Sequence, residues 1–136
     1  MMLLMDNVVT KPWGNETILT SPDLPYTAKI LNLKAGQRLS LQYHDQKTET
    51  LTLVSGQARI ILGNSVDSLT TTDMQVFQGY TISPNTIHRI EAVSDSIIFE
   101  ASSSEQGTTF RLQDDNSRKD ETPDIRDLPN RGWPNE

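Results

Sequence analysis

The sequence contains no cysteine and only two histidines among its 136 residues. Without cysteine the chain can form neither disulfides nor thiolate nucleophiles, so any bound metal must use histidine, carboxylate or amide ligands. A chain without cysteine also suits a reducing compartment, where disulfides are rare. We therefore expect a cytoplasmic protein.

Basic residues are also scarce, with 12 lysines and arginines against 18 acidic residues and a formal net charge of −6. Nucleic-acid binding needs clustered cations on the phosphate backbone, so this balance argues against a nucleic-acid partner. It leaves room for a phosphorylated small molecule, which needs only a few local cations. The apolar opening Met1–Met5 is too short to span a bilayer, so we expect no membrane partner.

Short β-rich runs separated by turn residues fill the middle of the chain, and helical periodicity is weak. A chain of this length suits one domain with one core. Strands spaced this evenly predict an all-β sandwich or barrel. The expected strands are Ala28–Leu33, Leu39–His44, Glu49–Val54, Ala58–Leu62, Met74–Phe77, Tyr80–Ser83, Ile87–Ala92 and Ile97–Ala101.

The two ends differ from the middle, which divides the chain into residues 1–26, 27–112 and 113–136. The first part holds three prolines and few periodic apolar residues, so we expect an N-terminal strand and a loop that wraps the barrel. Residues 114–136 carry seven acidic and four basic residues and almost no aliphatic ones, so they cannot bury enough apolar area to order themselves. We predict a polar C-terminal tail that is extended or docked on a neighbouring molecule, with Trp133 as its anchor.

Both histidines fall on positions that alternation predicts to face inward. Gln42 and His44 share one polar strand face, and Glu49 opens the next strand on a face that it shares with leucines. His88 shares its strand face with an isoleucine. Imidazole, carboxylate and amide oxygen together suit Zn, Mn, Ni, Co or Fe. The spacing alone leaves open that these are polar residues satisfied by hydrogen bonds rather than ligands.

Two sequence motifs resemble those of the cupin superfamily. The first is Gly36-(x)5-Gln42-x-His44-(x)4-Glu49-(x)6-Gly56, which is similar to the first cupin motif but has glutamine in place of its first histidine. The second is Gly79-(x)4-Pro84-(x)3-His88, which is similar to the second cupin motif. The resemblance implies a cupin jelly-roll barrel (a double-stranded β-helix) and a homodimer, with Met1–Met5 as a donated strand. It also implies one divalent metal, bound by Gln42, His44, Glu49 and His88.

A narrower resemblance points to the isomerase domain of type II mannose-6-phosphate isomerases. The segments that carry it are Lys11–Gly14, Ala28–Ile30, Gly36–His44, Val54–Ala58 and Phe110–Arg118. The match departs after His44, where the chain lacks two histidines and a His-Trp pair of the family and has Lys47 in place of an arginine. A chain of 136 residues cannot hold the nucleotidyltransferase domain that usually precedes this module, so guanylyltransferase activity is not expected.

This resemblance implies aldose–ketose isomerisation of a sugar phosphate. The reaction moves a proton between C1 and C2, and it needs a Lewis acid, a base and cations on the phosphate. For the phosphate we predict Arg38, Lys29, Arg111 and Lys11. For the catalytic base we predict Glu49, or Lys29 with a pKa lowered by burial. The alternatives are a non-catalytic carbohydrate-binding or sensing cupin and, less favoured, an iron-dependent oxygenase.

Overall fold

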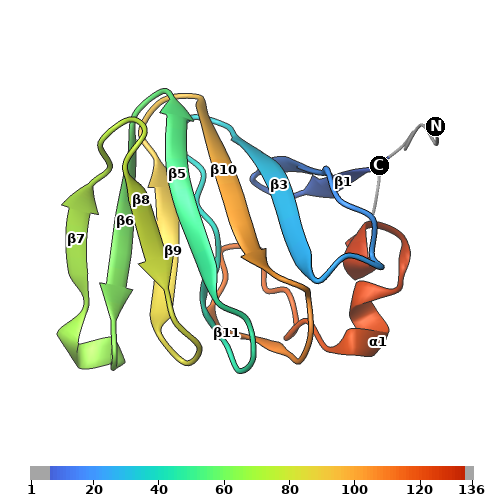
Figure 1. Ribbon diagram of the computed structural model, residues 1–136. Coiled ribbons are helices and arrows are strands. Elements are labelled where there is room, and N and C mark those ends of the chain that lie inside the picture. The colour runs from blue at the N-terminus through green and yellow to red at the C-terminus, as the bar shows by residue number, and fades with distance from the viewer. Residues whose placement is uncertain (1–6, 134–136) are drawn as a thin grey trace.

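The computed structural model describes residues 7–133, and its strands form two antiparallel sheets (Figure 1). The first sheet has the order β1 (Val8–Lys11), β2 (Gly14–Ile18), β3 (Tyr26–Leu33), β10 (Ser96–Ser103), β5 (Glu49–Ser55) and β8 (Gly79–Ile82). The second has the order β11 (Thr109–Gln113), β4 (Leu41–His44), β9 (Ile87–Ala92), β6 (Ala58–Gly63) and β7 (Thr70–Asp73). This architecture confirms the predicted all-β jelly roll.

The helical segments are short: η1 (Val66–Ser68), α1 (Pro123–Arg126) and η2 (Pro129–Gly132). No helix within residues 7–133 combines the length and the apolar character that a membrane crossing requires. Thr122 caps α1, because its side chain accepts a hydrogen bond from the backbone N–H of Ile125. Both α1 and η2 belong to the C-terminal segment, which lies at the edge of the barrel beside β1 and β3 (Figure 1).

Alternating apolar residues build the core between the two sheets. On β5, Leu51 and Leu53 are each buried, whereas Thr52 between them points to the other face of the sheet and is half-buried. The core comprises Trp13, Leu31, Leu33, Leu39, Leu51, Leu53, Ala58, Ile60, Met74, Ile82, Ile90, Ala92 and Ile98. Where every second residue is apolar, as on β5, the strand contributes one row of side chains to the core.

The inward faces change from apolar to charged at one end of the barrel. On β3, β5 and β10 the inward face carries Lys29, Glu49 and Glu100, each two residues from a buried leucine or isoleucine. Because β10 runs antiparallel to both β3 and β5, these three positions meet at the same end. All three charged side chains are buried. Charge that is buried in this way needs partners, and these partners form the candidate site.

The N-terminal residues form a β-hairpin instead of the predicted wrapping loop. β1 pairs with β2, and β2 extends the first sheet along β3. Gly14 permits this contact, because a Cβ atom there would lie 1.9 Å from the carbonyl oxygen of Asn32. Trp13 beside it is buried in the core. Each of these strands is too short for period-two alternation to reveal it in the sequence.

The C-terminal segment folds back on its own barrel, which corrects the prediction of an extended or neighbour-docked tail. Glu121 forms a β-bridge with Thr109, and both backbone N–H···O distances are 2.9 Å. The Asn130 side chain accepts a hydrogen bond from the backbone N–H of Thr10 at 3.0 Å. Trp133 is only half-buried. Ion pairs of Arg126 and Arg131 hold the segment on the barrel. The division of the chain at residues 26 and 112 stays a prediction.

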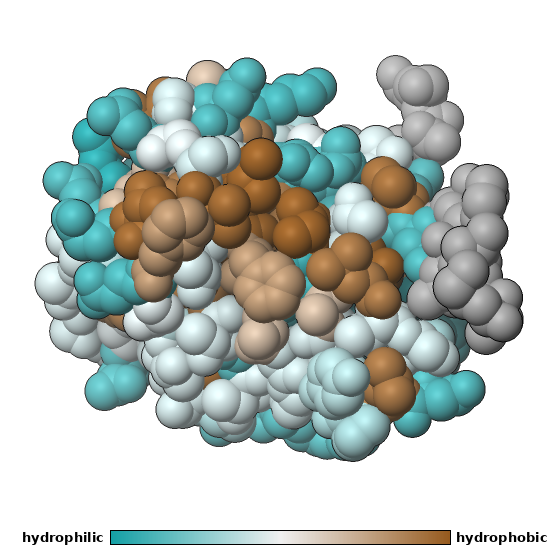
Figure 2. Space-filling model, turned by 45° about the horizontal axis from the view of Figure 1, so that its top comes forward, coloured by the Kyte–Doolittle hydropathy of each residue, from teal (hydrophilic) through white to brown (hydrophobic). Residues whose placement is uncertain are grey.

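Apolar side chains also gather on one outer face of the molecule (Figure 2). Ile97 on β10 of the first sheet is one exposed apolar residue, with 36% of its surface exposed. A contiguous apolar patch on a protein surface commonly marks an interaction site. The segment Met1–Met5, predicted as a donated strand, lies outside the described residues.

Candidate metal centre

Three buried side chains meet at the charged end of the barrel. His44 ends β4, Glu49 begins β5 and His88 lies near the start of β9. Glu49 Oε1 lies 2.9 Å from His88 Nε2 and 3.4 Å from His44 Nε2. One ligand atom from each of the three residues lies within 4.8 Å of the other two. The fold therefore brings together three of the four predicted metal ligands.

Strand pairing and one tight turn account for this meeting. β4 and β9 are neighbours in the second sheet, and Gln42 lies directly opposite His88. The loop before β9 is tied to β4, because the carbonyl oxygen of His44 accepts a hydrogen bond from Asn85 N–H at 2.7 Å. Asn85 has a φ of 67°, a left-handed conformation that asparagine tolerates better than most residues. Asparagine thus suits the backbone conformation of this turn.

The histidine rings are oriented so that their Nε2 atoms face the centre. His88 Nδ1 lies 2.9 Å from the carbonyl oxygen of Thr86, which can only accept, so Nδ1 carries the proton and Nε2 keeps its lone pair. His44 Nδ1 contacts the hydroxyl of Thr109 at 2.8 Å. Both Nε2 atoms are buried and lack a hydrogen bond of acceptable geometry within residues 7–133. Two buried imidazole nitrogens without a hydrogen-bond partner among these residues, beside a carboxylate, fit a divalent metal that is bound by nitrogen and oxygen.

The charges of the centre also favour metal binding. Burial lowers the pKa of His44 to about 4, and the cation of Lys47 acts in the same direction, so His44 is neutral at pH 7 and able to act as a ligand. Burial alone would raise the pKa of Glu49, but its surroundings, above all the Lys47 cation, outweigh burial and hold that pKa well below its usual value. Neutral imidazole and ionised carboxylate are the forms that coordinate metals.

Gln42, the fourth predicted ligand, lies beside the centre, and its role stays a prediction. It is half-buried and lines the same cavity as His44 and Glu49. Its Oε1 accepts a hydrogen bond from the hydroxyl of Ser40 at 2.7 Å. An amide oxygen has two lone pairs, so this bond leaves one available to a metal.

Lys47 and Glu100 complete the centre, and neither was predicted as a site residue. Lys47 Nζ lies 3.1 Å from Glu49 Oε2 and 3.3 Å from Glu100 Oε2, so one buried ammonium bridges two buried carboxylates. In the sequence Lys47 resembles a surface residue of a turn, although it stands where the family has an arginine. Glu100 shares its strand face with the core residue Ile98, and this alternation in the sequence could have indicated that Glu100 points inward.

A narrow cavity of about 70 Å³ opens beside the centre and is lined mainly by charged residues. Seven lining residues are basic: Lys11, Lys29, Lys47, Arg111, Arg118, Arg126 and Arg131. Five are acidic: Glu16, Glu49, Glu100, Glu105 and Glu121. The lining therefore carries two more basic than acidic side chains in a chain whose formal net charge is −6.

Three of the four predicted phosphate ligands line this cavity, namely Lys11, Lys29 and Arg111. Arg38 instead lies outside it and is 39% exposed at its side chain. Its guanidinium donates two hydrogen bonds to Asp115, at 2.7 and 2.8 Å, and a third to Glu91. With its donors engaged in this way, Arg38 gains no support as a phosphate ligand.

Lys29 is not the base that the sequence suggested. Burial acts to lower its pKa, but the nearby carboxylates of Glu16, Glu105 and Glu100 outweigh burial, so the pKa is raised. Lys29 pairs with Glu16 at 3.4 Å and with Glu105. A lysine that is held protonated by several carboxylates cannot accept a proton near neutral pH, which overturns the prediction of a lowered pKa.

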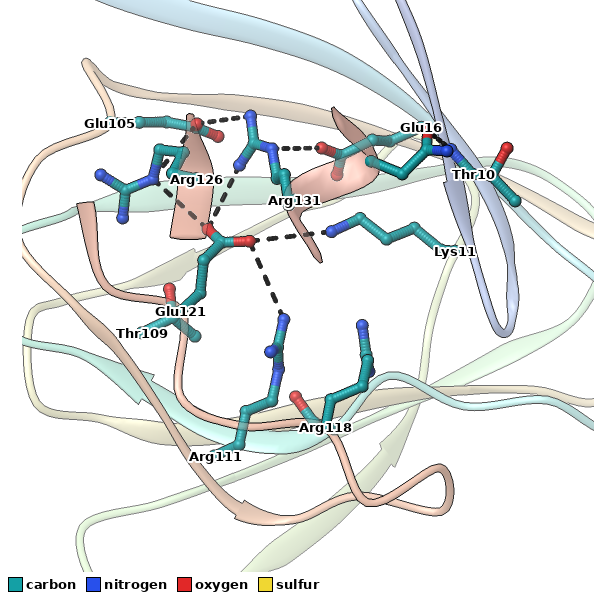
Figure 3. Close-up of polar contacts among 12 residues, drawn as sticks. Thr10, Lys11, Glu16, Glu105, Thr109, Arg111, Arg118, Glu121, Arg126 and Arg131 are labelled. Carbon is teal, nitrogen blue, oxygen red and sulfur yellow. Dashed lines mark hydrogen bonds and ion pairs between the residues drawn. The ribbon is translucent and has the colours of Figure 1, made fainter. Parts of the chain in front are cut away.

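The C-terminal segment supplies part of the cavity wall through an ion-pair network (Figure 3). Arg131 lies 2.7 Å from Glu105 and 3.5 Å from Glu16, so it joins η2 to β2 and to the loop after β10. Arg126 lies 3.3 Å from Glu121 and donates a hydrogen bond to the carbonyl oxygen of Gly107 at 2.8 Å. These contacts explain why a segment almost without aliphatic residues is ordered on the barrel.

Comparison with solved structures shows the same fold in proteins of low sequence identity. KdgF from Halomonas sp. is 16% identical, with a TM-score of 0.59 over 71% of this chain and 84% of that one. Oxalate decarboxylase from Bacillus subtilis is 18% identical, with a TM-score of 0.65 over 77% of this chain and 29% of that one. The capsular polysaccharide assembling protein CapF from Staphylococcus aureus is 18% identical, with a TM-score of 0.61 over 83% of this chain and 32% of that one. The chain thus spans about a third of the latter two.

A search of curated protein sequences finds no match. The family described as mannose-6-phosphate isomerase C-terminal matches residues 2–120, which is most of the chain. This match agrees with the jelly-roll fold and with the placement of both motif histidines in one buried centre. The chain therefore belongs to the mannose-6-phosphate isomerase C-terminal family of cupins.

Proposed function

We propose that this protein is a metal-dependent isomerase that interconverts the aldose and ketose forms of a sugar phosphate, with mannose 6-phosphate as the first candidate. The observation that carries the proposal is the buried cluster of His44, Glu49 and His88 beside a cavity with more cations than carboxylates. Family membership supports the reaction class. The similar fold of CapF, a capsular polysaccharide assembling protein, supports a carbohydrate ligand.

In this proposal His44, Glu49 and His88 hold one divalent ion, Zn, Mn, Ni, Co or Fe, with Gln42 as a fourth ligand. A metal bound there supplies Lewis acidity to the oxygens on C1 and C2 of the sugar. Thr109 and the Thr86 carbonyl orient the two imidazole rings, and Lys47 holds the second oxygen of Glu49. Such outer contacts fix ligand geometry before the substrate binds.

Glu100 is the residue that we propose as the base. Its Oε2 is engaged by Lys47 at 3.3 Å and by the Ser102 hydroxyl at 3.1 Å, and its side chain lines the cavity. Burial raises the pKa of Glu100, while Lys47 lowers it and Glu49 raises it further. A carboxylate with a raised pKa is a better proton acceptor than the strongly acidic Glu49, and it can return the proton to the neighbouring carbon.

Lys11 and Arg111 remain our proposed phosphate ligands. Both line the cavity, and both contact the carboxylate of Glu121 only at long range, 3.8 and 3.9 Å. A phosphate monoester, with a charge near −2, would give these cations closer partners. We leave Lys29 out of this proposal, because it already pairs with Glu16 and Glu105.

The test is turnover of mannose 6-phosphate and fructose 6-phosphate by purified protein that has been loaded in turn with Zn, Mn or Co. Glu100→Gln should lower kcat by about 10²- to 10⁴-fold, the usual contribution of a general base, with metal content unchanged. Glu91→Gln, the same change at a residue that pairs with Arg38 outside the cavity, should leave kcat near wild type. Absence of turnover with every metal and every hexose phosphate tried would refute the isomerase.

Non-catalytic sugar-phosphate binding is the second candidate, because one observation favours it. The cavity of about 70 Å³ offers space for only a few waters, so a hexose phosphate enters only if ion-paired side chains rearrange. Thermal stabilisation by mannose 6-phosphate without turnover would favour this function.

We also propose a homodimer in the cytoplasm. The apolar outer face of the barrel supports the dimer, and the absence of cysteine suits the cytoplasm. Light scattering on the purified protein measures the oligomeric state directly, and a monomer at micromolar concentration would contradict the dimer.

A further inference from the structure

One buried carboxylate from the C-terminal segment lies among four cations (Figure 3). Glu121 Oε2 is 3.3 Å from both Arg126 and Arg131, while Glu121 Oε1 is 3.8 Å from Lys11 and 3.9 Å from Arg111. Glu121 is 6% exposed. The four cations come from β1, β11, α1 and η2, so segments that are far apart in the sequence converge on this one acidic group.

The cations of this cluster are unequally satisfied. Arg131 also pairs with Glu105 at 2.7 Å, whereas Glu121 is the only acidic side chain within 4.0 Å of the Lys11 and Arg111 cationic groups in the described part of the chain. Both of these contacts exceed hydrogen-bond length. Arg111 Nε is in addition buried without a partner among residues 7–133. Two cations in this cluster therefore have unused capacity to bind an anion.

The cluster is linked directly to the metal centre. Glu121 forms its β-bridge with Thr109, whose hydroxyl contacts His44 Nδ1 at 2.8 Å. Thr109 thus connects the backbone of Glu121 to the proposed metal ligand His44, and both Glu121 and His44 line the same cavity. This arrangement suits a substrate with a phosphate at one end and a reacting group at the other.

We infer that Glu121 occupies the phosphate position of the cavity, and that a phosphate monoester displaces its carboxylate and binds Lys11, Arg111, Arg126 and Arg131. Phosphate carries up to two negative charges and three acceptor oxygens, so it matches four cations better than one carboxylate does. The β-bridge holds the Glu121 backbone in place, so only the side chain has to turn away. The inference deepens the proposed function. It rests on that function for the sugar part of the ligand, whereas binding of the phosphate group is argued from the four cations alone.

The inference is tested with inorganic phosphate as the probe on the full chain, without added metal and at constant ionic strength. Glu121→Gln removes the internal competitor, so it should bind phosphate about tenfold more tightly than wild type, by calorimetry. Its melting temperature should fall in phosphate-free buffer and recover on addition of phosphate. Glu91→Gln, which frees Arg38 outside the cavity, should show no gain in phosphate affinity.

Equal phosphate affinity in wild type and Glu121→Gln, or an equal gain in Glu91→Gln, would overturn the inference. If Glu121→Gln does not fold, Glu121→Asp serves instead, because its shorter side chain withdraws the carboxylate from the cations and should also raise phosphate affinity. Mannose 6-phosphate should compete with phosphate, and mannose should not. If Glu121→Gln binds phosphate more tightly but neither protein shows isomerase turnover, the inference stands and only the proposed enzyme is refuted. If both proteins show turnover and the KM of Glu121→Gln is unchanged, only the inference is refuted.

Discussion

Replacing Lys47 with methionine should strongly destabilise the protein. The substitution keeps most of the apolar stem but removes the ammonium that Glu49 and Glu100 share at 3.1 and 3.3 Å. All three side chains are buried, so water cannot replace the lost partner. Removing one partner of a buried ion pair costs about 3–5 kcal/mol, which in a domain of this size lowers the melting temperature by roughly 10–20 °C.

The penalty should also depend on pH and on metal. Glu49 has a depressed pKa, so its stabilising effect is present above the pKa of the unfolded chain and is lost as the pH falls toward the folded value. The difference between wild type and Lys47→Met should therefore be largest at pH 7 and smaller at pH 4. A bound divalent ion would offset the charge of Glu49, so the difference should also shrink when metal is added.

Urea unfolding of both proteins in EDTA, at pH 7 and pH 4, measures these differences. Lys47→Arg keeps the charge and introduces the residue that the family has there, so it should lie within about 1.5 kcal/mol of wild type. Lys34→Met, at an exposed lysine, should change stability by less than about 0.5 kcal/mol. The reasoning would be refuted if Lys47→Met in EDTA at pH 7 lay within about 1 kcal/mol of wild type, because the carboxylates would then not depend on this cation.

Three further predictions concern the metal, the backbone and a buried lysine. His88→Ala should abolish retention of divalent metal after dialysis, measured by elemental analysis, and equal retention would contradict the assigned centre. Gly14→Ala should lower the free energy of unfolding by more than about 3 kcal/mol, because the new Cβ would lie 1.9 Å from a backbone oxygen. In the control Gly36→Ala the new Cβ meets nothing within 4 Å, so the loss should be about 1–2 kcal/mol, for the left-handed φ alone. Burial lowers the pKa of Lys11 to about 8, so the charged form of Lys11 destabilises the folded protein below that pH. Lys11→Met should therefore be more stable than wild type by up to about 3 kcal/mol at pH 7, and this gain should vanish as the pH rises toward 10.5. Unfolding at several pH values measures the gain.

Local patterns made the fold and the three residues of the buried cluster predictable. Period-two alternation along β5 and β6 reflects a requirement that each strand meets by itself, namely one apolar face for the core. Motif spacing indicated His44, Glu49 and His88, because a ligand near the end of a strand returns to the same rim as its neighbours. Gly14 and Trp13 were visible as part of a family segment, although the hairpin that they support was not.

The pairing of the charged residues could not be predicted, because an ion pair depends on distances in space and leaves no periodic mark in the sequence. Lys47 resembled a surface turn residue, yet the return of β5 beside β10 buries it between two carboxylates. The polar tail lacks apolar residues for a core of its own, as its composition indicated. Only the tertiary structure brings Glu121 and Arg131 to the cavity, where cations and carboxylates from distant segments supply the stabilisation that apolar burial cannot.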